Sequence, residues 1–264
     1  MNVAAPFDGL AADYDRSFTA SAVGERLRAA VWRRVDATFQ PGERILELNC
    51  GTGEDAVHLG RRGVHVLATD SSVRMLETTR AKVERAGQAG IVEVAPLAIE
   101  DLPAAELGTF DGVLSNFGGL NCVHDLPGVA QGLAAMLRPG ARALLCIMGP
   151  VVPWEWAWYL VHGQPRKALR RLRRGGAHWR GLTIRYPSIG VVRRAFAPHF
   201  RQRRVSAIGA LLPPTYTDDW AARHPQLLAA LDRWERSVET IPPLPWMADH
   251  YLIELERNRD CDRT

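Results

Sequence analysis

Two acidic residues on either side of a turn of small residues are the first candidates for chemistry in this chain. Residues 45–53 read ILELNCGTG, an apolar run of strand character that contains Glu47 and ends in residues permitting a sharp turn. Residues 54–62 can be helical, so backbone N–H groups at the start of that helix point at a ligand. A second apolar run, 64–69, stops at Asp70, where an acid in a right-handed βαβ unit can reach both hydroxyls of a ribose.

The residues of this turn indicate which kind of nucleotide it can hold. Dinucleotide folds use Gly-x-Gly-x-x-Gly, and their turn faces a pyrophosphate. Here the order is Glu47, Asn49, Gly51 and Gly53, with one residue between each pair. A carboxylate at the end of the strand repels phosphate but suits a cationic ligand with a free amino group. The turn therefore favours a positively charged nucleoside.

This pattern resembles motif I of the class I S-adenosylmethionine-dependent methyltransferases, and the resemblance covers about Phe7 to Gly149. Asn49 stands where the family usually has its first glycine. Because Asn tolerates left-handed backbone conformations better than most residues, we expect the turn to be kept. The resemblance implies an α/β fold with a doubly wound, seven-stranded, mostly parallel sheet of the Rossmann-like type, an N-terminal helical arm and an inserted cap. It also implies S-adenosyl-L-methionine as cofactor and S-adenosyl-L-homocysteine as product.

Further cofactor contacts are expected at the carboxyl ends of the parallel strands, because ligands of open α/β sheets bind there. Strands are predicted at 45–48, 64–69, 91–95, 109–117 and 141–148. The predicted cofactor-binding residues are Tyr14 in the arm, Glu47, Asn49, Gly51 and Gly53 in the turn, Asp70, Ser71 and Met75 after the second strand, Ile99 and Glu100 after the third, and Ser115 and Asn116 at the end of the fourth. Tyr14 is either a lid over the cofactor or a packing aromatic. Family members often have an adenine-reading acid at the position of Ala98, which leaves Ile99 and Glu100 as the candidates for that contact.

The chain of 264 residues divides by pattern into four parts. Residues 1–40 form the helical arm, 41–149 the cofactor-binding core, 150–186 a basic Trp-rich insertion, and 187–264 the completion of the sheet with a helical insertion at 215–246. The net charge of +4 is unevenly distributed: residues 150–205 hold 13 Lys and Arg and one acid, Glu155, a formal charge of +12, and the remainder carries −8. A neutral to acidic body thus bears one strongly basic segment.

Composition narrows the class of protein. Hydrophobic residues are 47% and charged residues 23%, as in soluble globular proteins. No run of about 18 apolar residues and no secretory signal is visible, so we expect a cytoplasmic protein. The four cysteines lack the spacing of metal ligands, and no His, Cys or Asp pattern predicts a metal site.

The sequence gives the weakest indication of the methyl acceptor and of the general base. His124 follows the fourth strand, where substrate should enter, and is the predicted general base if the nucleophile arrives protonated. The first insertion is the predicted substrate selector, through Trp154, Trp158, Tyr159 and Arg166. We expect methyl transfer to an O or N atom of a small, apolar or anionic metabolite. An acidic carrier or an anionic surface is a possible partner of the insertion, and the chain is expected to be a monomer or homodimer.

Two other functions fit the same pattern. Arg residues with interleaved aromatics can track phosphates and stack bases, which is compatible with an RNA or other nucleic-acid methyltransferase. Base methyltransferases, however, often carry Asn/Asp-Pro-Pro-aromatic after the fourth strand, where residues 115–118 read SNFG. Nucleic acid is therefore the less favoured substrate. The second alternative is an S-adenosylmethionine-binding protein without catalysis.

Overall fold

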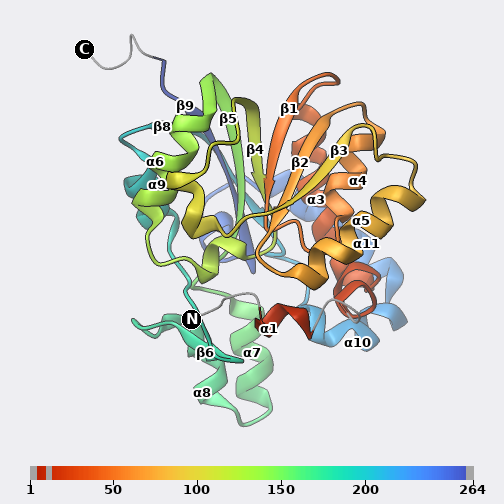
Figure 1. Cartoon of the computed structure of the whole chain (residues 1–264). Helices are drawn as coiled ribbons and strands as arrows, with labels where there is room; N and C mark the ends of the chain where they lie inside the picture. The colour runs from red at the N-terminus through yellow and green to blue at the C-terminus, as the bar shows by residue number, and fades with distance from the viewer. Residues whose placement is uncertain (1–4, 10–13, 260–264) are drawn as a thin grey trace.

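The computed structural model describes residues 5–9 and 14–259. A seven-stranded sheet of order β3-β2-β1-β4-β5-β9-β8 runs through its centre (Figure 1). The strands are β1 (Arg44–Leu48), β2 (His65–Asp70), β3 (Val92–Pro96), β4 (Phe110–Ser115), β5 (Leu137–Met148), β8 (Phe200–Ile208) and β9 (His250–Arg257). The first five pair in parallel, and β9 lies antiparallel between β5 and β8. Strand order reverses between β1 and β4, so the predicted doubly wound sheet is confirmed.

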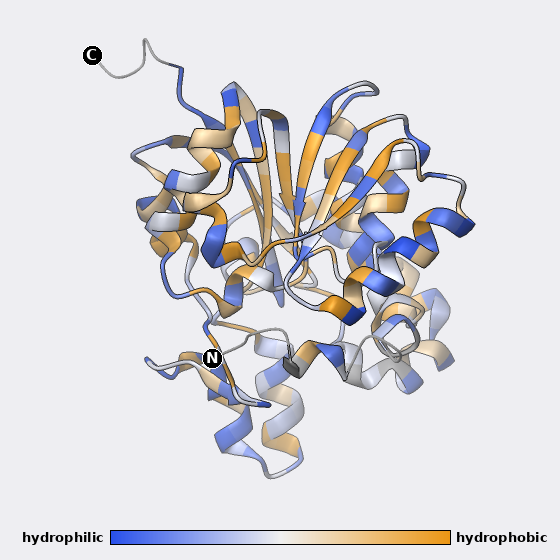
Figure 2. Ribbon diagram, in the orientation of Figure 1, coloured by the Kyte–Doolittle hydropathy of each residue, from blue (hydrophilic) through white to orange (hydrophobic). Residues whose placement is uncertain are grey.

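Helices cover both faces of this sheet, which explains why its central strands β1 and β4 are buried along almost their whole length and mostly apolar (Figure 2). The helices α3 (Ala22–Thr38), α4 (Glu54–Arg61) and α5 (Val73–Arg85) pack on one face, and α6 (Leu126–Met136) and α9 (Ile189–Phe196) on the other. Ser72 accepts the N–H of Met75 at 3.2 Å and so caps α5. Each face has its own hydrophobic core, and both cores hold the turn after β1 in place.

The N-terminal arm crosses the carboxyl ends of the strands. Its described parts are α1 (Ala5–Asp8) and the π-helical turn η1 (Asp15–Thr19), which leads into α3. Asp15 anchors the arm to the body, because it accepts hydrogen bonds from Thr52 and from Lys82, the latter at 2.7 Å. Burial raises the pKa of Asp15, but these hydrogen bonds outweigh it and leave the pKa below its ordinary value. The arm is therefore held over the sheet edge by a charged contact.

The first insertion forms a cap that projects beyond the carboxyl ends of the strands (Figure 1). It consists of α7 (Pro153–Val161), α8 (Pro165–Ala168), the turn η4 (Arg170–Leu172) and a hairpin of β6 (Ala177–Trp179) and β7 (Leu182–Ile184). The Arg-rich sequence of residues 166–174 suggests one short basic helix, but the chain forms α8 and η4 there instead. The chain breaks after α8 because Arg170 and Arg171 turn inward to the carboxylate of Glu155.

Arg171 fastens the cap to the sheet. Its side chain is buried, donates to the carbonyls of Gly149 and Asp249, and pairs with the carboxylates of Glu155 at 2.8 Å and Asp249 at 2.5 Å. Since burial of an unpaired guanidinium would be costly, both acids are needed where they are. The pKa of Asp249, which burial alone would raise, is held well below its ordinary value chiefly by the charge of Arg171.

The second insertion lies beside the α3 face. It contains η5 (Thr215–Thr217), α10 (Asp218–Arg223), α11 (Pro225–Val238) and η6 (Leu244–Trp246). The pattern of residues 204–212 suggests a strand before this insertion, and the structure has that strand earlier, at β8. In the described part of the chain, no helix is both long and apolar enough to cross a bilayer.

Candidate active site

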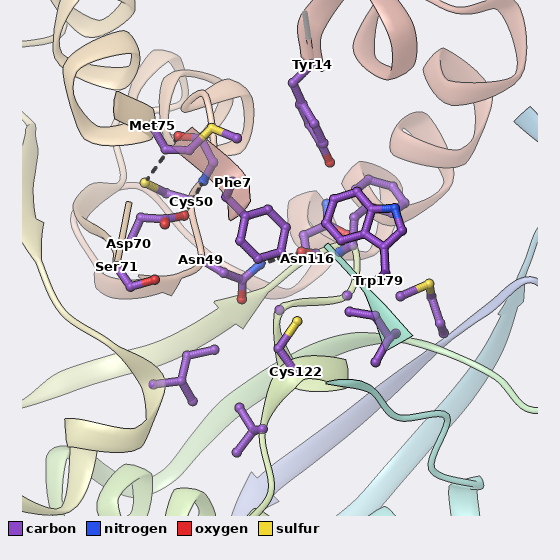
Figure 3. A pocket seen from close by; sticks show the side chains of 18 of the residues that line it. Phe7, Tyr14, Asn49, Cys50, Asp70, Ser71, Met75, Asn116, Cys122 and Trp179 are labelled. Carbon is purple, nitrogen blue, oxygen red and sulfur yellow. Dashed lines mark hydrogen bonds between the residues drawn. The ribbon is translucent and has the colours of Figure 1, made fainter. Parts of the chain in front are cut away.

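A pocket of about 650 Å³ opens at the carboxyl ends of β1, β2 and β4, between the turn, the arm and the cap (Figure 3). Nine of the predicted cofactor residues line it: Tyr14, Asn49, Gly51, Asp70, Ser71, Met75, Ile99, Glu100 and Asn116. Burial raises the pKa of the Tyr14 phenol to about 12. The sequence thus located one contiguous wall of the pocket.

The turn after β1 has the left-handed backbone that its residues suggested. Asn49 has φ 50°, Gly51 φ 56° and Gly53 φ 81°. Asn49 donates from Nδ2 to the carbonyl of Asn116 at 2.6 Å, and its Oδ1 accepts from the Ser115 hydroxyl. The residue that replaces the family's glycine therefore ties the end of β1 to the end of β4.

The two glycines of the turn have different tasks. A Cβ on Gly51 would meet nothing within 4 Å, because it would point into the pocket. A Cβ on Gly53 would come within 2.6 Å of the Thr79 side chain. The expectation that both glycines make room for a ligand needs correction, because Gly53 makes room for α5.

Asp70 lies where the second strand ends, facing the same space. Its Oδ2 accepts the N–H of Gly51 at 3.0 Å and its Oδ1 that of Ser72 at 2.9 Å. Burial raises the pKa of this carboxyl group, against the effect of these backbone donors. Each carboxylate oxygen has a further lone pair, so Asp70 can also accept from a ligand.

Opposite charges lie together beneath the turn. Asp55 accepts from Arg28 at 2.8 Å, from Trp32 at 2.6 Å and from Asn116 at 2.9 Å. Although burial works against it, these contacts keep the pKa of Asp55 below its ordinary value. Arg28 nevertheless keeps one buried nitrogen, Nε, without a hydrogen-bond partner among the described residues.

Glu47 is 1% exposed and belongs to the same group of charges. Burial, and secondarily the charge of Asp55, raise the pKa of Glu47 well above its ordinary value. Within the described residues its Oε2 finds no hydrogen-bond donor. One buried acceptor, on Glu47, and one buried donor, on Arg28, thus lack partners within the same group of charges.

The cap supplies the opposite end of the pocket. Tyr159, Lys167, Arg170, Trp179 and Tyr186 line it there. The Arg170 guanidinium lies 5.3 Å from the centroid of the Tyr159 ring and the Lys167 ammonium 5.8 Å from it. This end is aromatic and basic, whereas the turn end is acidic.

Comparison with known proteins agrees with this geometry. A family described as "Methyltransferase domain" matches residues 45–140. A demethylmenaquinone methyltransferase of Clavibacter sepedonicus is 38% identical over 154 residues, covering 57% of this chain and 60% of that protein. One of the same name from Thermobifida fusca (strain YX) is 34% identical over 173 residues, covering 62% and 70%. The chain thus aligns with 60–70% of the length of these two relatives.

The chain belongs to the class I S-adenosylmethionine-dependent methyltransferases.

Solved structures share the fold of this methyltransferase. An S-adenosylmethionine dependent methyltransferase from Mesorhizobium loti has a TM-score of 0.56 at 20% identity, covering 88% of this chain and 100% of that one. Geranyl diphosphate C-methyltransferase from Streptomyces coelicolor A3(2), in complex with S-adenosyl-L-homocysteine, has a TM-score of 0.56 at 13% identity, covering 87% and 76%. The Rossmann-like fold predicted from motif I is therefore confirmed.

S-adenosylmethionine fits the residues present. Gly51 leaves open space at the turn, Asp70 has free acceptor capacity, and the Arg28 guanidinium, which lines the pocket, suits the carboxylate of a methionine group. Arg28 was missed in the sequence because an arginine on an amphipathic helix reads as a solvated face. Glu47 itself lies behind the pocket lining. It would therefore act on the cofactor through its electrostatic effect on Arg28 and Asp55 and not by direct contact.

Several predicted residues lie elsewhere. His124 is exposed, outside the pocket lining, and its Nδ1 accepts from Arg185 at 2.7 Å. The polypeptide turns away after η3 (Gly119–Cys122) and carries His124 to the surface. Ser115 is buried and supports Asn49 without facing the pocket. Trp154, Trp158 and Arg166 also lie outside the lining, so of the predicted substrate residues only Tyr159 faces the pocket.

A second histidine lies where His124 was expected. His250 begins β9, pairs with Met148 at the carboxyl end of β5, and is buried. Its Nδ1 is 3.2 Å from Asp249 Oδ2, an ion-pair distance without hydrogen-bond alignment. It lines a side cavity of about 230 Å³, which shares Tyr14 and Met148 with the main pocket. No motif marked His250, because only the antiparallel pairing of β9 brings it there.

The described residues contain no group of three or more His, Cys, Asp or Glu side chains arranged to hold a metal ion.

Proposed function

We propose that this methyltransferase methylates an O or N atom of a small acceptor with a flat apolar body and an anionic group. One observation carries the proposal: a single pocket has acids at the turn and aromatic and cationic side chains at the cap. Arg170 is paired with Glu155 at 3.1 Å. Lys167 has no carboxylate within salt-bridge distance among the residues that the structure describes, so it is the cation available to an acceptor.

Binding of the cofactor and binding of the acceptor fall to different elements. When bound, S-adenosylmethionine supplies an electrophilic methyl group on a sulfonium. Asp70 would hold the ribose, and Arg28 the carboxylate of the amino-acid group, with Glu47 acting on it from behind the pocket lining. The cap aromatics would stack on the acceptor and Lys167 would hold its anion, so that the nucleophile is oriented toward the turn.

Exclusion of water falls to the arm and the cap together. Phe7 of α1 and Trp179 of β6 lie with ring centroids 5.9 Å apart, at the side of the pocket opposite the sheet (Figure 3). The hydroxyl of Ser72 donates to Asp8, which holds α1 against the cofactor end. A closed, dry site strengthens each charge contact inside it.

His250 is the group we propose to accept a proton from the nucleophile. It lines a cavity that shares Tyr14 and Met148 with the pocket, and Asp249 beside it would stabilise the imidazolium that forms. Asp249 is in turn fixed by Arg171. His250 thus replaces His124 as the proposed base.

The proposal is tested by S-adenosylhomocysteine formation with matched acceptors. Phenols and anilines with and without a carboxylate or phosphate would be compared, with demethylmenaquinone included because the relatives are named for it. We expect the parent enzyme to turn over the anionic member of each pair faster. Lys167→Ala should remove that preference, because it should raise the KM for the anionic acceptor about tenfold. Equal turnover of both members by the parent enzyme would contradict the proposed acceptor class.

A further inference from the structure

Helix α7 of the cap carries a stripe of exposed apolar side chains. Trp154, Trp158 and Val161 of α7 follow at helical spacing of four and three residues, and their exposures are 40%, 37% and 84%. In an ordinary surface helix such a stripe faces the core. In α7 the side chain turned to the core is that of Glu155 instead.

The stripe continues into the neighbouring turns of the cap. Leu160 also belongs to α7, Leu169 precedes η4 and Leu172 ends it; all three are exposed. The cap projects from the body, so these side chains lie on a protruding part of the molecule (Figure 1). Exposed apolar groups gathered in this way mark an interaction surface.

The cap also exposes basic side chains, and within its described residues no acid is exposed. The exposed basic residues are Arg166, Lys167, Arg173, Arg174 and Arg180. The only acid of residues 150–186, Glu155, is 1% exposed and paired with Arg170 and Arg171. The partner of this face must therefore be negatively charged and must also accept apolar groups.

We propose that the α7–α8 face of the cap docks on an anionic lipid bilayer. Apolar side chains at the outermost positions with Lys and Arg beside them are the arrangement of interfacial, membrane-lying segments. Trp suits the boundary between headgroups and acyl chains, because its ring is apolar and its N–H is polar. An acidic protein would satisfy the arginines, but it offers less to a stripe that ends in Leu160 and Val161.

The docked cap would place the pocket mouth next to the lipid. Lys167, Trp179 and Tyr159 belong to the cap and line the acceptor end of the pocket. A lipophilic acceptor dissolved in the bilayer would then enter without crossing water. Docking itself does not depend on the acceptor, so it is tested without turnover.

The test is flotation of the whole protein with vesicles of phosphatidylglycerol and phosphatidylcholine in equal amounts, or of phosphatidylcholine alone. We expect binding to the anionic vesicles only, with loss of most binding at about 0.5 M salt, because screening weakens the charge contribution. Val161→Asp and the double change Arg173→Glu with Arg174→Glu should each reduce the bound fraction at least fivefold.

Matched changes elsewhere serve as controls. Trp234→Asp on α11 and Arg193→Glu with Arg194→Glu on α9 alter equally exposed residues away from the cap and should leave binding unchanged. Unchanged circular dichroism and cofactor affinity show that each variant is folded. Equal binding to both vesicle types, or equal loss in cap and control variants, would overturn the proposal. Binding to polyglutamate without binding to vesicles would overturn it in favour of an acidic protein partner.

Discussion

At the scale of single residues, Asp70 connects the turn to the ligand. Its oxygens accept the N–H groups of Gly51 and Ser72. We expect Asp70→Ala to weaken S-adenosylmethionine binding by about 1.5–3 kcal/mol, about 10- to 100-fold in Kd, since charged hydrogen bonds are lost. Titration calorimetry measures this. Asp111→Ala, at the amino end of β4, is the control, and an unchanged affinity of Asp70→Ala would remove Asp70 from the site.

His250 and His124 form a natural pair for testing the base. We expect His250→Gln to lower kcat by about 100-fold or more, the scale of general base catalysis, and to remove the acid limb of the pH–rate profile. KM for S-adenosylmethionine should stay the same. The change His124→Gln, at the surface, should leave kcat and the pH–rate profile unchanged. Loss of activity in the His124 variant alone would restore the original prediction.

What the sequence revealed at this scale depended on distance along the chain. Asn49, Gly51 and Asp70 belong to one βαβ unit, so their spacing carried the information. Arg28 meets Asp55 from 27 residues away, and His250 reaches the pocket from the last strand. Such encounters are decided by tertiary packing, for which a single sequence has no local signal.

At the scale of elements, the turn after β1 depends on one glycine that faces the ligand. Gly51→Ala would strain a residue at φ 56° by about 1–2 kcal/mol and add a methyl group to the pocket. We therefore expect lower stability and a Kd for S-adenosylmethionine raised at least tenfold. Urea unfolding and calorimetry separate the two effects.

Gly87 provides the control for that change. It lies after α5 at φ 67°, and a Cβ added there would meet nothing within 4 Å, so Gly87→Ala carries a similar backbone cost away from the pocket. Its cofactor affinity should equal that of the parent. If both variants bind equally well, the open space at Gly51 is not the cofactor site.

Regular elements of the core were predictable and the cap was not. In residues 41–149 the apolar residues recur at spacings that make one face of each helix, or both faces of each strand, apolar. The observed bounds of these elements differ from the predicted ones by a few residues. In the cap, ion pairs of Arg170 and Arg171 with Glu155 break the expected helix. Charge pairing over long range overrode local helix preference there.

At the scale of the whole molecule, Glu256 joins three strands through arginines. It pairs with Arg142 of β5 at 2.8 Å, with Arg203 of β8 at 2.7 Å, and with Arg201. Hydrogen bonds from Arg203, despite partial burial, lower the pKa of Glu256 to about 2. A carboxyl group with a lowered folded-state pKa stabilises the protein above its unfolded-state pKa, and this stabilisation is lost as the pH falls toward 2.

Glu256→Gln should therefore lower the free energy of unfolding by about 1–2 kcal/mol at pH 7, a value reduced for the solvent screening of the arginines. The difference from the parent should narrow as the pH is lowered from about 5 to 3. Urea unfolding at several pH values measures it. Glu84→Gln on the exposed side of α5 should change little, and a pH-independent difference for Glu256→Gln would contradict the electrostatic origin.

The position of β9 between β5 and β8 also bears on how the protein is made. In chain order β9 comes after every other described strand, yet it is the strand through which β8 joins the sheet. While the chain emerges from the ribosome, β5 presents an unpaired apolar edge until β9 arrives. Unpaired edges attract strands of other molecules, so we expect the nascent chain to need chaperones until β9 has been made.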